Sequence, residues 1–173
     1  MLLPAKEKMR FRNATLDDLP EIVAIYNATI PGKIVTADLT PVTVEEKLNW
    51  YHLHNETSRP LWVCINENNV IMGWVSFQNF YGRIAYEGCA EVSIYFKETY
   101  SGKGLGKTAL NHAIENCPKL NIHTLLGFIF EQNQQSIKLF QSAGFEIWGT
   151  LPDVANMQTH FCSLLIMGRK ITY

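Results

Sequence analysis

The chain has 173 residues, 47% of them hydrophobic, and a formal net charge of −1. This length fits one compact domain with a substantial core, and the balanced charge argues against nucleic acid or an acidic membrane surface as a partner. We therefore expect residues 1–173 to form a single domain, in which residues 1–8 are a short N-terminal extension.

The cysteine pattern and the lack of long apolar runs indicate a cytoplasmic protein. The four cysteines are widely separated and form no C-x-x-C pair, which argues against a zinc ribbon and a disulfide framework. No run approaches the roughly 18 apolar residues of a membrane span, and the first apolar run is too short for a signal peptide. His52 and His54 would lie on different faces of a helix, so we expect no metal site.

The first half of the chain predicts two helices and four strands from its hydrophobic periodicity. Thr15 or Asp17 is expected to cap the first helix, which Pro31-Gly32 ends. The second helix, over residues 43–56, has a weaker pattern, and the polar residues 66–69 are typical of a hairpin turn. Strands are expected at residues 9–13, 61–65, 70–78 and 91–96.

The second half alternates helices with strands. An apolar stripe predicts a helix over residues 105–117, and the nearly continuous apolar run at 122–130 is typical of a strand covered on both faces. The remaining elements are a short helix, capped by Asn133 and ended by Gly144, and strands near residues 145–150 and 160–167. Together these elements predict an α/β (α+β) fold with a mixed sheet and helices on both faces.

The stretch YSGKGLGKTAL, residues 100–110, places three glycines before the third helix, where backbone amides could hold an anion. A nucleoside-triphosphate loop would need glycine where Ser101 stands. Residues 104–109 match the dinucleotide-binding pattern G-x-G-x-x-G/A. In a dinucleotide-binding fold, however, the first glycine directly follows a strand near the start of a long βαβ array, which is not the case here. The glycines alone therefore leave two interpretations open: a binding site for another anion, or an ordinary turn without a ligand.

Residues 91–109 and 133–145 together resemble the GNAT superfamily of acetyl-coenzyme A dependent N-acetyltransferases. The first motif of that superfamily, a strand followed by [QR]-x-x-G-x-[GA], is similar to SGKGLG at residues 101–106, with Ser101 in place of glutamine or arginine. The second motif appears as NQQSIKLFQSAGF at residues 133–145. The resemblance implies the GNAT fold, a mixed, mostly antiparallel central sheet of about six or seven strands with helices on both faces.

Within that superfamily, FYGRIAYEGCAEVSIYF at residues 80–96 resembles the phosphinothricin acetyltransferase group. That group acetylates the amino group of small amino-acid analogues such as phosphinothricin and methionine sulfoximine. Phe161 and Ser163 stand near the places where the group usually has tryptophan and aspartate. The sequence therefore defines the superfamily more firmly than it defines the acceptor. The resemblance implies acetyl-CoA as cosubstrate, a small amine as acceptor, no metal, and a homodimer.

The resemblance also implies a coenzyme site. Amides of residues 102–107 would hold the pyrophosphate, and strand residues 94–96 would offer backbone groups to the pantetheine arm. Asn133 has two open roles, as helix cap and as pantetheine contact. The cofactor-binding residues expected are Ile94, Tyr95, Phe96, Gly102, Lys103, Gly104, Leu105, Gly106, Lys107, Asn133, Ser136 and Phe140. Lys103 and Lys107 could equally be solvated surface lysines.

Glu91 is the candidate catalytic residue, a general base for the substrate ammonium, with its pKa raised by apolar neighbours. A surface or hairpin glutamate is the competing interpretation. Many superfamily members place a tyrosine acid where this chain has Phe140, so the general acid is open and Tyr95 is a weaker alternative donor.

The acceptor site is expected to include Glu91, Val92 and Ser93, with Arg83 as anchor for an acidic group because a guanidinium matches a carboxylate or phosphinate bidentately. Arg83 could also be an ordinary surface arginine, and residues 29–40 are expected to cover the pocket. Two rival functions remain: the same transfer to another amine, such as a polyamine or a protein N-terminus, and a module that binds acyl-coenzyme A without catalysis.

Overall fold

The computed structural model describes residues 8–172, so the expected extension at residues 1–8 lies outside the description except for its last residue. Within this range the helices are α1 (Leu19–Asn27), α2 (Val44–His52), α3 (Leu105–Asn116) and α4 (Gln134–Ser142). The strands are β1 (Arg10–Asn13), β2 (Leu61–Ile65), β3 (Ile71–Asn79), β4 (Cys89–Phe96), β5 (Thr124–Phe130), β6 (Glu146–Asn156) and β7 (Phe161–Lys170). Among the described helices, none has the length and apolar character to cross a membrane.

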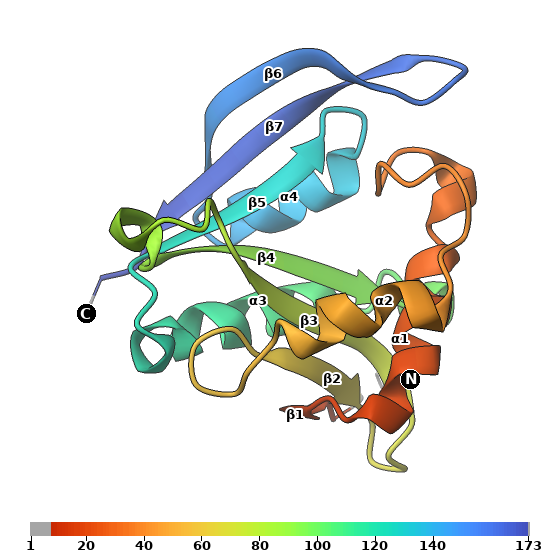
Figure 1. Ribbon diagram of the computed structural model, residues 1–173, viewed down its shortest axis with the longest axis vertical. Coiled ribbons are helices and arrows are strands. Elements are labelled where there is room, and N and C mark those ends of the chain that lie inside the picture. Colours follow the sequence, from red (N-terminus) through yellow and green to blue (C-terminus); the bar gives the residue numbers. More distant parts are fainter. Residues whose placement is uncertain (1–7, 173) are drawn as a thin grey trace, which may run out of the picture.

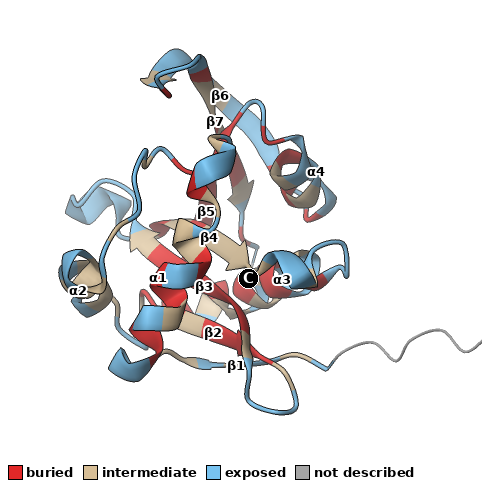
Figure 2. Cartoon of the chain, turned by 90° about the vertical axis from the view of Figure 1, so that its right-hand side faces the viewer, coloured by how far each residue is buried: buried red, intermediate tan, exposed pale blue. Residues whose placement is uncertain are grey.

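The strands form one seven-stranded sheet in the order β1-β2-β3-β4-β5-β7-β6 (Figure 1). Every neighbouring pair is antiparallel except β4 and β5, which are parallel. Helices α1 and α2 cover one face of the sheet, and α3 and α4 cover the other (Figure 2). The predicted mixed, mostly antiparallel sheet with helices on both faces is confirmed.

Buried side chains gather on both faces of the sheet because strand residues alternate in direction. Val75 and Phe77 of β3 pack in the cluster that includes Leu110 of α3. Trp74, the residue just before Val75, packs on the opposite face with Ile22 of α1. One strand thus joins two cores, and residues at its alternate positions are available to a site on the α1 side.

Local hydrogen bonds position two of the expected elements. The Asn66 side chain accepts from the Val70 amide at 3.0 Å in the β2–β3 hairpin. At the start of α2, the Glu46 amide donates to Thr43 Oγ1 at 3.2 Å and the Thr43 amide donates to Glu46 Oε2 at 2.7 Å. This reciprocal capping box accounts for a helix whose hydrophobic pattern is weak.

Several element boundaries differ from the sequence expectation. Helix α2 ends at His52 rather than at residue 56, because Asn55 Oδ1 accepts from the Ser58 amide at 2.9 Å and so forms a turn. Strand β4 begins at Cys89, two residues before the expected start. Strand β6 continues to Asn156, beyond the expected end at residue 150, and a register irregularity between Leu151 and Ala155 accommodates Pro152 and Asp153.

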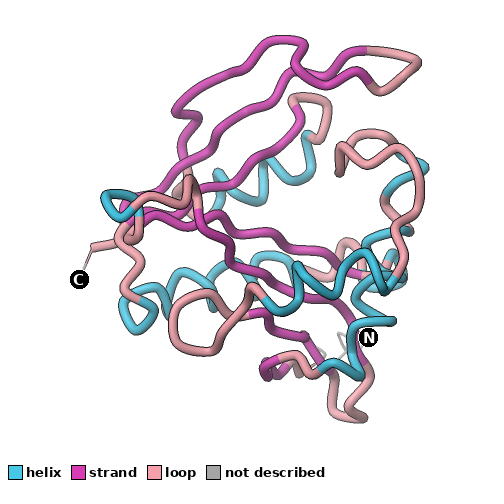
Figure 3. Tube along the Cα trace, viewed as in Figure 1, coloured by secondary structure: helices cyan, strands magenta, loops and turns pink. Residues whose placement is uncertain are grey.

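Strands β4 and β5 separate after a short ladder, which is the feature that positions the site. Their pairing runs only from Cys89↔Thr124 to Glu91↔Leu126. Beyond this point the two strands diverge, as the tube in Figure 3 shows. Strand β4 stays paired with β3 as far as Phe96, whereas its other edge, after Glu91, has no strand partner among residues 8–172.

Candidate active site

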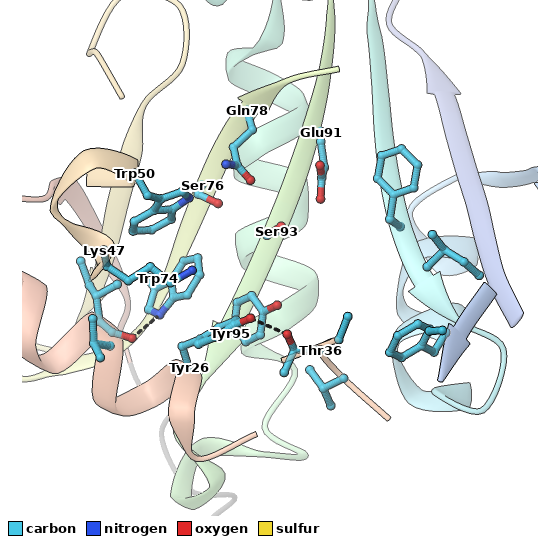
Figure 4. A pocket seen from close by; sticks show the side chains of 18 of the residues that line it. Tyr26, Thr36, Lys47, Trp50, Trp74, Ser76, Gln78, Glu91, Ser93 and Tyr95 are labelled. Carbon is cyan, nitrogen blue, oxygen red and sulfur yellow. Dashed lines mark hydrogen bonds between the residues drawn. The ribbon is translucent and has the colours of Figure 1, made fainter. Parts of the chain in front are cut away.

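A cavity of about 400 Å³ lies on the α1 and α2 face of the sheet, beside the separation of β4 and β5 (Figure 4). Two facing strands supply its floor, because alternate residues of β3 and β4 point the same way. Those residues form three cross-strand pairs, Gln78 with Glu91, Ser76 with Ser93, and Trp74 with Tyr95. The floor therefore runs from a polar end at Glu91 to an aromatic end at Tyr95.

Glu91 contributes its carboxylate to this cavity. Burial raises the pKa of Glu91, and a hydrogen bond with the Ser93 side chain acts in the opposite direction. Burial has the larger effect, so the Glu91 side chain stays protonated up to a higher pH than an exposed glutamate does. A carboxylate with a raised pKa in a cavity can accept a proton from a bound group near neutral pH.

The loop between α1 and α2 closes one side of the cavity through Val35, Thr36 and Ala37. The Tyr26 hydroxyl donates to Asp38 Oδ2 at 2.5 Å and also hydrogen-bonds to Thr36. Burial, followed by the hydrogen bond to Asp38, raises the pKa of Tyr26 to about 12, which keeps this hydroxyl a donor.

The same loop is fixed at its far end by Asn27. The Asn27 side chain donates to the Val42 carbonyl at 2.8 Å and accepts from the Val42 amide at 2.9 Å. Lys33 Nζ donates to the Met157 carbonyl at 3.3 Å, which joins the loop to the β6–β7 hairpin. The loop is thus held by α1 on one side of the cavity and by the hairpin on the other.

A second, narrow cavity of about 50 Å³ lies in the separation of β4 and β5, against α4. Its lining includes five of the expected cofactor residues, Ile94, Tyr95, Asn133, Ser136 and Phe140, together with Val92. Val35, Ser93, Tyr95 and Phe128 line both cavities, so the two meet at these side chains. A thin group passing between the strands would therefore reach the cavity that holds Glu91.

Asn133 serves as a helix cap, one of the two roles left open by the sequence. Its Oδ1 accepts from the Ser136 amide at 3.1 Å at the start of α4. The residue is 8% exposed and also lines the narrow cavity. Capping is therefore established, while the pantetheine contact of Asn133 stays a prediction.

The glycine loop before α3 has the backbone of an anion cradle. Gly102 and Gly104 have φ angles of 74° and 76°, and no heavy atom lies within 4 Å of a Cβ added to either. Helix α3 begins at Leu105 without a side-chain cap, so its first amides have no such acceptor. These amides and the positive end of the helix dipole fit a pyrophosphate.

The other residues of the loop have different surroundings. Leu105 is 6% exposed and belongs to the core, so it offers only its amide. A Cβ on Gly106 would lie 3.1 Å from Leu139 Cδ2, which makes this glycine a packing position between α3 and α4. Lys103 Nζ lies 4.9 Å from the Tyr100 ring centroid, and Lys107 is exposed.

Arg83 lies apart from both cavities. It immediately precedes a short 3-10 turn (Ile84–Tyr86) in the exposed loop between β3 and β4, and neither lining includes it. The buried Arg59 fixes this loop by donating to the Glu87 carbonyl at 2.5 Å. Phe96 also lies outside both linings, at the last pair of β4 with β3.

Several residues of the larger cavity escaped the sequence analysis. Lys47 and Trp50 come from α2, and Lys47 Nζ lies 4.8 Å from the Tyr26 ring centroid and 5.5 Å from that of Trp50. Ser76 and Gln78 could have been found from the alternation of β3, which predicts that they share a face. Nothing in the sequence indicates that α2 lies over that face.

The donor set offers no candidate metal centre. Among residues 8–172, no group of three or more histidine, cysteine, aspartate or glutamate side chains could hold a metal ion. The four cysteines are buried and free, and burial raises the pKa of Cys89. A buried thiol of this kind is a poor nucleophile.

The chain is similar to known acetyltransferases over most of its length. The Acetyltransferase (GNAT) family pattern matches residues 21–145. YwnH of Bacillus subtilis, named as an inferred phosphinothricin acetyltransferase, is 46% identical over 95% of this chain and 100% of its own. The L-methionine sulfoximine/L-methionine sulfone acetyltransferase of Pseudomonas paraeruginosa is 29% identical over 90% of this chain and 91% of its own.

A solved structure has the same fold. YncA of Salmonella typhimurium, described as an inferred acetyltransferase with its cofactor acetyl-CoA, has a TM-score of 0.87 and 26% identity, over 96% of this chain and 95% of its own. The chain belongs to the GNAT acetyltransferase family.

Proposed function

We propose that this protein is an acetyl-CoA dependent N-acetyltransferase that acts on the α-amino group of a small amino-acid analogue such as phosphinothricin or methionine sulfoximine. The observation that carries the proposal is the junction of the two cavities, where Ser93 and Tyr95 line both. A coenzyme arm in the narrow cavity would present its end to an acceptor beside Glu91. The names of two relatives support this acceptor class.

The proposed coenzyme site uses backbone groups at two places. Amides at residues 102–107 would hold the pyrophosphate, and the unpaired edge of β4 at residues 94–96 would hydrogen-bond the amides of the pantetheine arm. Asn133, Ser136 and Phe140 would flank that arm, since they line the narrow cavity. When bound there, acetyl-CoA supplies an acetyl thioester, and the acetyl-CoA in the YncA structure supports this choice of cosubstrate.

Glu91 acts as the base in this proposal. The acceptor enters as an ammonium ion, and Glu91 takes one proton from it, directly or through a water, which leaves a neutral amine. The raised pKa of Glu91 brings the proton affinities of the two groups closer together. The amine nitrogen then forms a bond to the acetyl carbon as the carbon–sulfur bond breaks. The nitrogen loses a second proton to become an amide, and this proton replaces the one that the leaving thiolate takes up.

The leaving thiolate takes up a proton to become the free thiol. Phe140 has no proton to give, and it packs against Gly127 and Phe145. Tyr95 is the proposed donor because it lies at the junction of the cavities, and burial raises its pKa so that the hydroxyl stays protonated. A thiol with an ordinary pKa of about 8.5 can also leave without a dedicated acid.

Ser93 and Val92 complete the proposed acceptor site in different ways. Ser93 contacts the acceptor beside Glu91, whereas Val92 is 2% exposed and shapes the narrow cavity from the other face of β4. Arg83 remains a proposed contact for acidic acceptors as they approach the site, because its loop connects β3 and β4 next to Glu91.

We also propose that the protein is a cytoplasmic homodimer of single domains that each span residues 1–173. Strand β6 supports the dimer because it is a mostly exposed edge of the sheet that carries Ile147, Trp148 and Leu151. Four free, buried cysteines fit a reducing compartment. Light scattering of the purified protein that gave the monomer mass at micromolar concentration would contradict the dimer.

Release of free thiol from acetyl-CoA across a panel of amines tests the function. The panel contains methionine sulfoximine, methionine sulfone, phosphinothricin, spermidine and a peptide with a free N-terminus. The proposal predicts turnover that is fastest with the amino-acid analogues. Faster turnover of spermidine or the peptide would favour another amine, and tight coenzyme binding without any turnover would favour a binding module.

A further inference from the structure

Lys47 is the single lysine or arginine among the described residues that line the larger cavity. It rises from α2 and is half-buried, with its ammonium group over the rings of Tyr26 and Trp50. A lysine that lines a small cavity presents its charge to a molecule bound there, because an ammonium removed from water is stabilised by an anionic partner. The position of Lys47 therefore raises the question of which group pairs with its ammonium.

The described residues supply no carboxylate for Lys47. The ion pairs described join Arg12 to Asp18 and Lys97 to Glu21, and neither includes Lys47. The two aromatic rings attract the cation but offer no hydrogen-bond acceptor of ordinary strength. Within residues 8–172, the Lys47 ammonium thus has its position fixed while its N–H donors stay available for an anion.

Glu91 lies at the opposite end of the same cavity. The Trp50 ring is 5.6 Å from the Trp74 ring, and Trp74 stands opposite Tyr95, two cross-strand pairs away from Glu91. Figure 4 shows Lys47 beside Trp50 and Trp74, with Glu91 across the cavity on β4. The cavity therefore carries one positive and one negative group at separate places, with aromatic and hydroxyl side chains between them.

We propose that Lys47 binds an acidic group of the acceptor while Glu91 faces its amine, so that the cavity selects small molecules that carry both groups. This inference rests on the proposed function, which places the acceptor in this cavity. The acid is a carboxylate or a phosphinate, both of which accept hydrogen bonds from an ammonium. Lys47 is then a specificity-determining residue inside the cavity, in contrast to Arg83 on its exposed loop.

Substrate pairs that differ only in the acid test this proposal. Methionine sulfone and phosphinothricin are each compared with the derivative whose α-carboxylate is a carboxamide, for the wild type, Lys47→Met and Lys47→Arg. Lys119→Met is the matched control, because Lys119 is exposed and outside both cavities. Comparing variants on each compound cancels the effect of the carboxamide on amine basicity.

Lys47→Met is expected to raise KM for methionine sulfone about tenfold or more, the usual cost of losing a charge-assisted hydrogen bond, with little change in kcat. The penalty should disappear for the carboxamide of methionine sulfone, and Lys47→Arg should restore most of the affinity. A penalty that persists for the carboxamide of phosphinothricin would assign the acid to the phosphinate rather than to the carboxylate. Equal penalties for all four compounds, or none, would overturn the proposal.

Calorimetry separates this inference from the proposed function. Methionine sulfone is titrated into the wild type and Lys47→Met in the presence of coenzyme A. Weaker binding to Lys47→Met supports the anchor even if the wild type transfers no acetyl group, in which case only the function fails. Equal affinity for both proteins overturns the anchor while leaving the function intact, and no binding to the wild type overturns both.

Discussion

Glu91 and Leu126 form the last residue pair of the parallel ladder between β4 and β5. The candidate base therefore lies at the point where the two strands separate. Residues that follow Glu91 on β4 have an edge open to a coenzyme arm, and the side chain of Glu91 faces the larger cavity. One strand thus presents the base and the proposed coenzyme contacts within six residues, from Glu91 to Phe96.

Glu91 should lower stability at neutral pH. Its pKa is raised by burial, so the folded protein binds this proton more tightly than the unfolded chain does. The stability that this tighter proton binding contributes is therefore fully present below the pKa of Glu91 in the unfolded chain. It is lost as pH rises through the pKa of Glu91 in the folded protein. Thermal unfolding of Glu91→Gln should give a Tm at pH 7 equal to or above that of the wild type, with the difference vanishing below about pH 4.

Glu146→Gln is the control, because Glu146 is exposed at the start of β6. Its Tm should follow that of the wild type at every pH. A Glu91→Gln protein that is less stable than the wild type at pH 7 would show that the ionised carboxylate stabilises the fold, contrary to the direction of its pKa shift.

Gly104→Ala should weaken acetyl-CoA binding. The residue has a φ of 76°, where a side chain costs about 1 kcal/mol or more, and relaxation of that strain would move the amides at the start of α3. We expect KM for acetyl-CoA to rise about fivefold or more, with a smaller change in KM for the amine. Initial rates at saturating amine give the value.

Gly32→Ala is the matched control, because no atom crowds a Cβ there and its φ is not positive. It should leave KM for acetyl-CoA unchanged. If both alanine variants bound acetyl-CoA as the wild type does, the loop before α3 would not be the pyrophosphate site.

Asn133 substitutions separate its cap from its proposed coenzyme contact. Asn133→Ala should destabilise the protein by about 1 kcal/mol, because the Ser136 amide loses its acceptor. Asn133→Asp keeps the oxygen and should restore most of that stability in urea unfolding. If KM for acetyl-CoA stays raised in Asn133→Asp, the amide group contacts the coenzyme, whereas full recovery would limit Asn133 to capping.

Tyr26→Phe should loosen the loop that covers the cavity. The change removes the hydroxyl that donates to Asp38 and bonds to Thr36 but keeps the ring under Lys47. We expect faster amide hydrogen exchange over residues 33–40 and a KM for the acceptor raised about threefold to tenfold. Unchanged exchange in this loop would mean that Asn27 and Lys33 hold it without Tyr26.

The fold was predictable where periodicity is strong. The apolar stripe of α3 and the continuous run of β5 each identify an element without tertiary information. The cap at Asn133 and the turn at Asn66 were also predictable, because their bonds are made within a few residues. Boundaries failed where a strand continues past an irregularity, as in β6, since its ladder with β7 resumes at Ala155.

The larger cavity was only partly predictable. Glu91 and Ser93 share a strand face by alternation, but Lys47, 44 residues before Glu91 in the chain, lines the same cavity only because α2 packs over the sheet. The point at which β4 and β5 separate depends on where their parallel ladder stops, and the sequence EVSIYF does not predict that point. Side-chain pairing across distant elements is therefore what the structure adds.

The pH dependence of kcat/KM for methionine sulfoximine, measured for the wild type and Glu91→Gln with saturating acetyl-CoA, tests the central claim most directly. The account predicts a wild-type profile that falls at acid pH with an apparent pKa above that of an ordinary glutamate, as the raised pKa of Glu91 requires. In Glu91→Gln the rate should drop about a hundredfold or more and this acid limb should disappear. A variant that keeps the wild-type rate and profile would contradict the account.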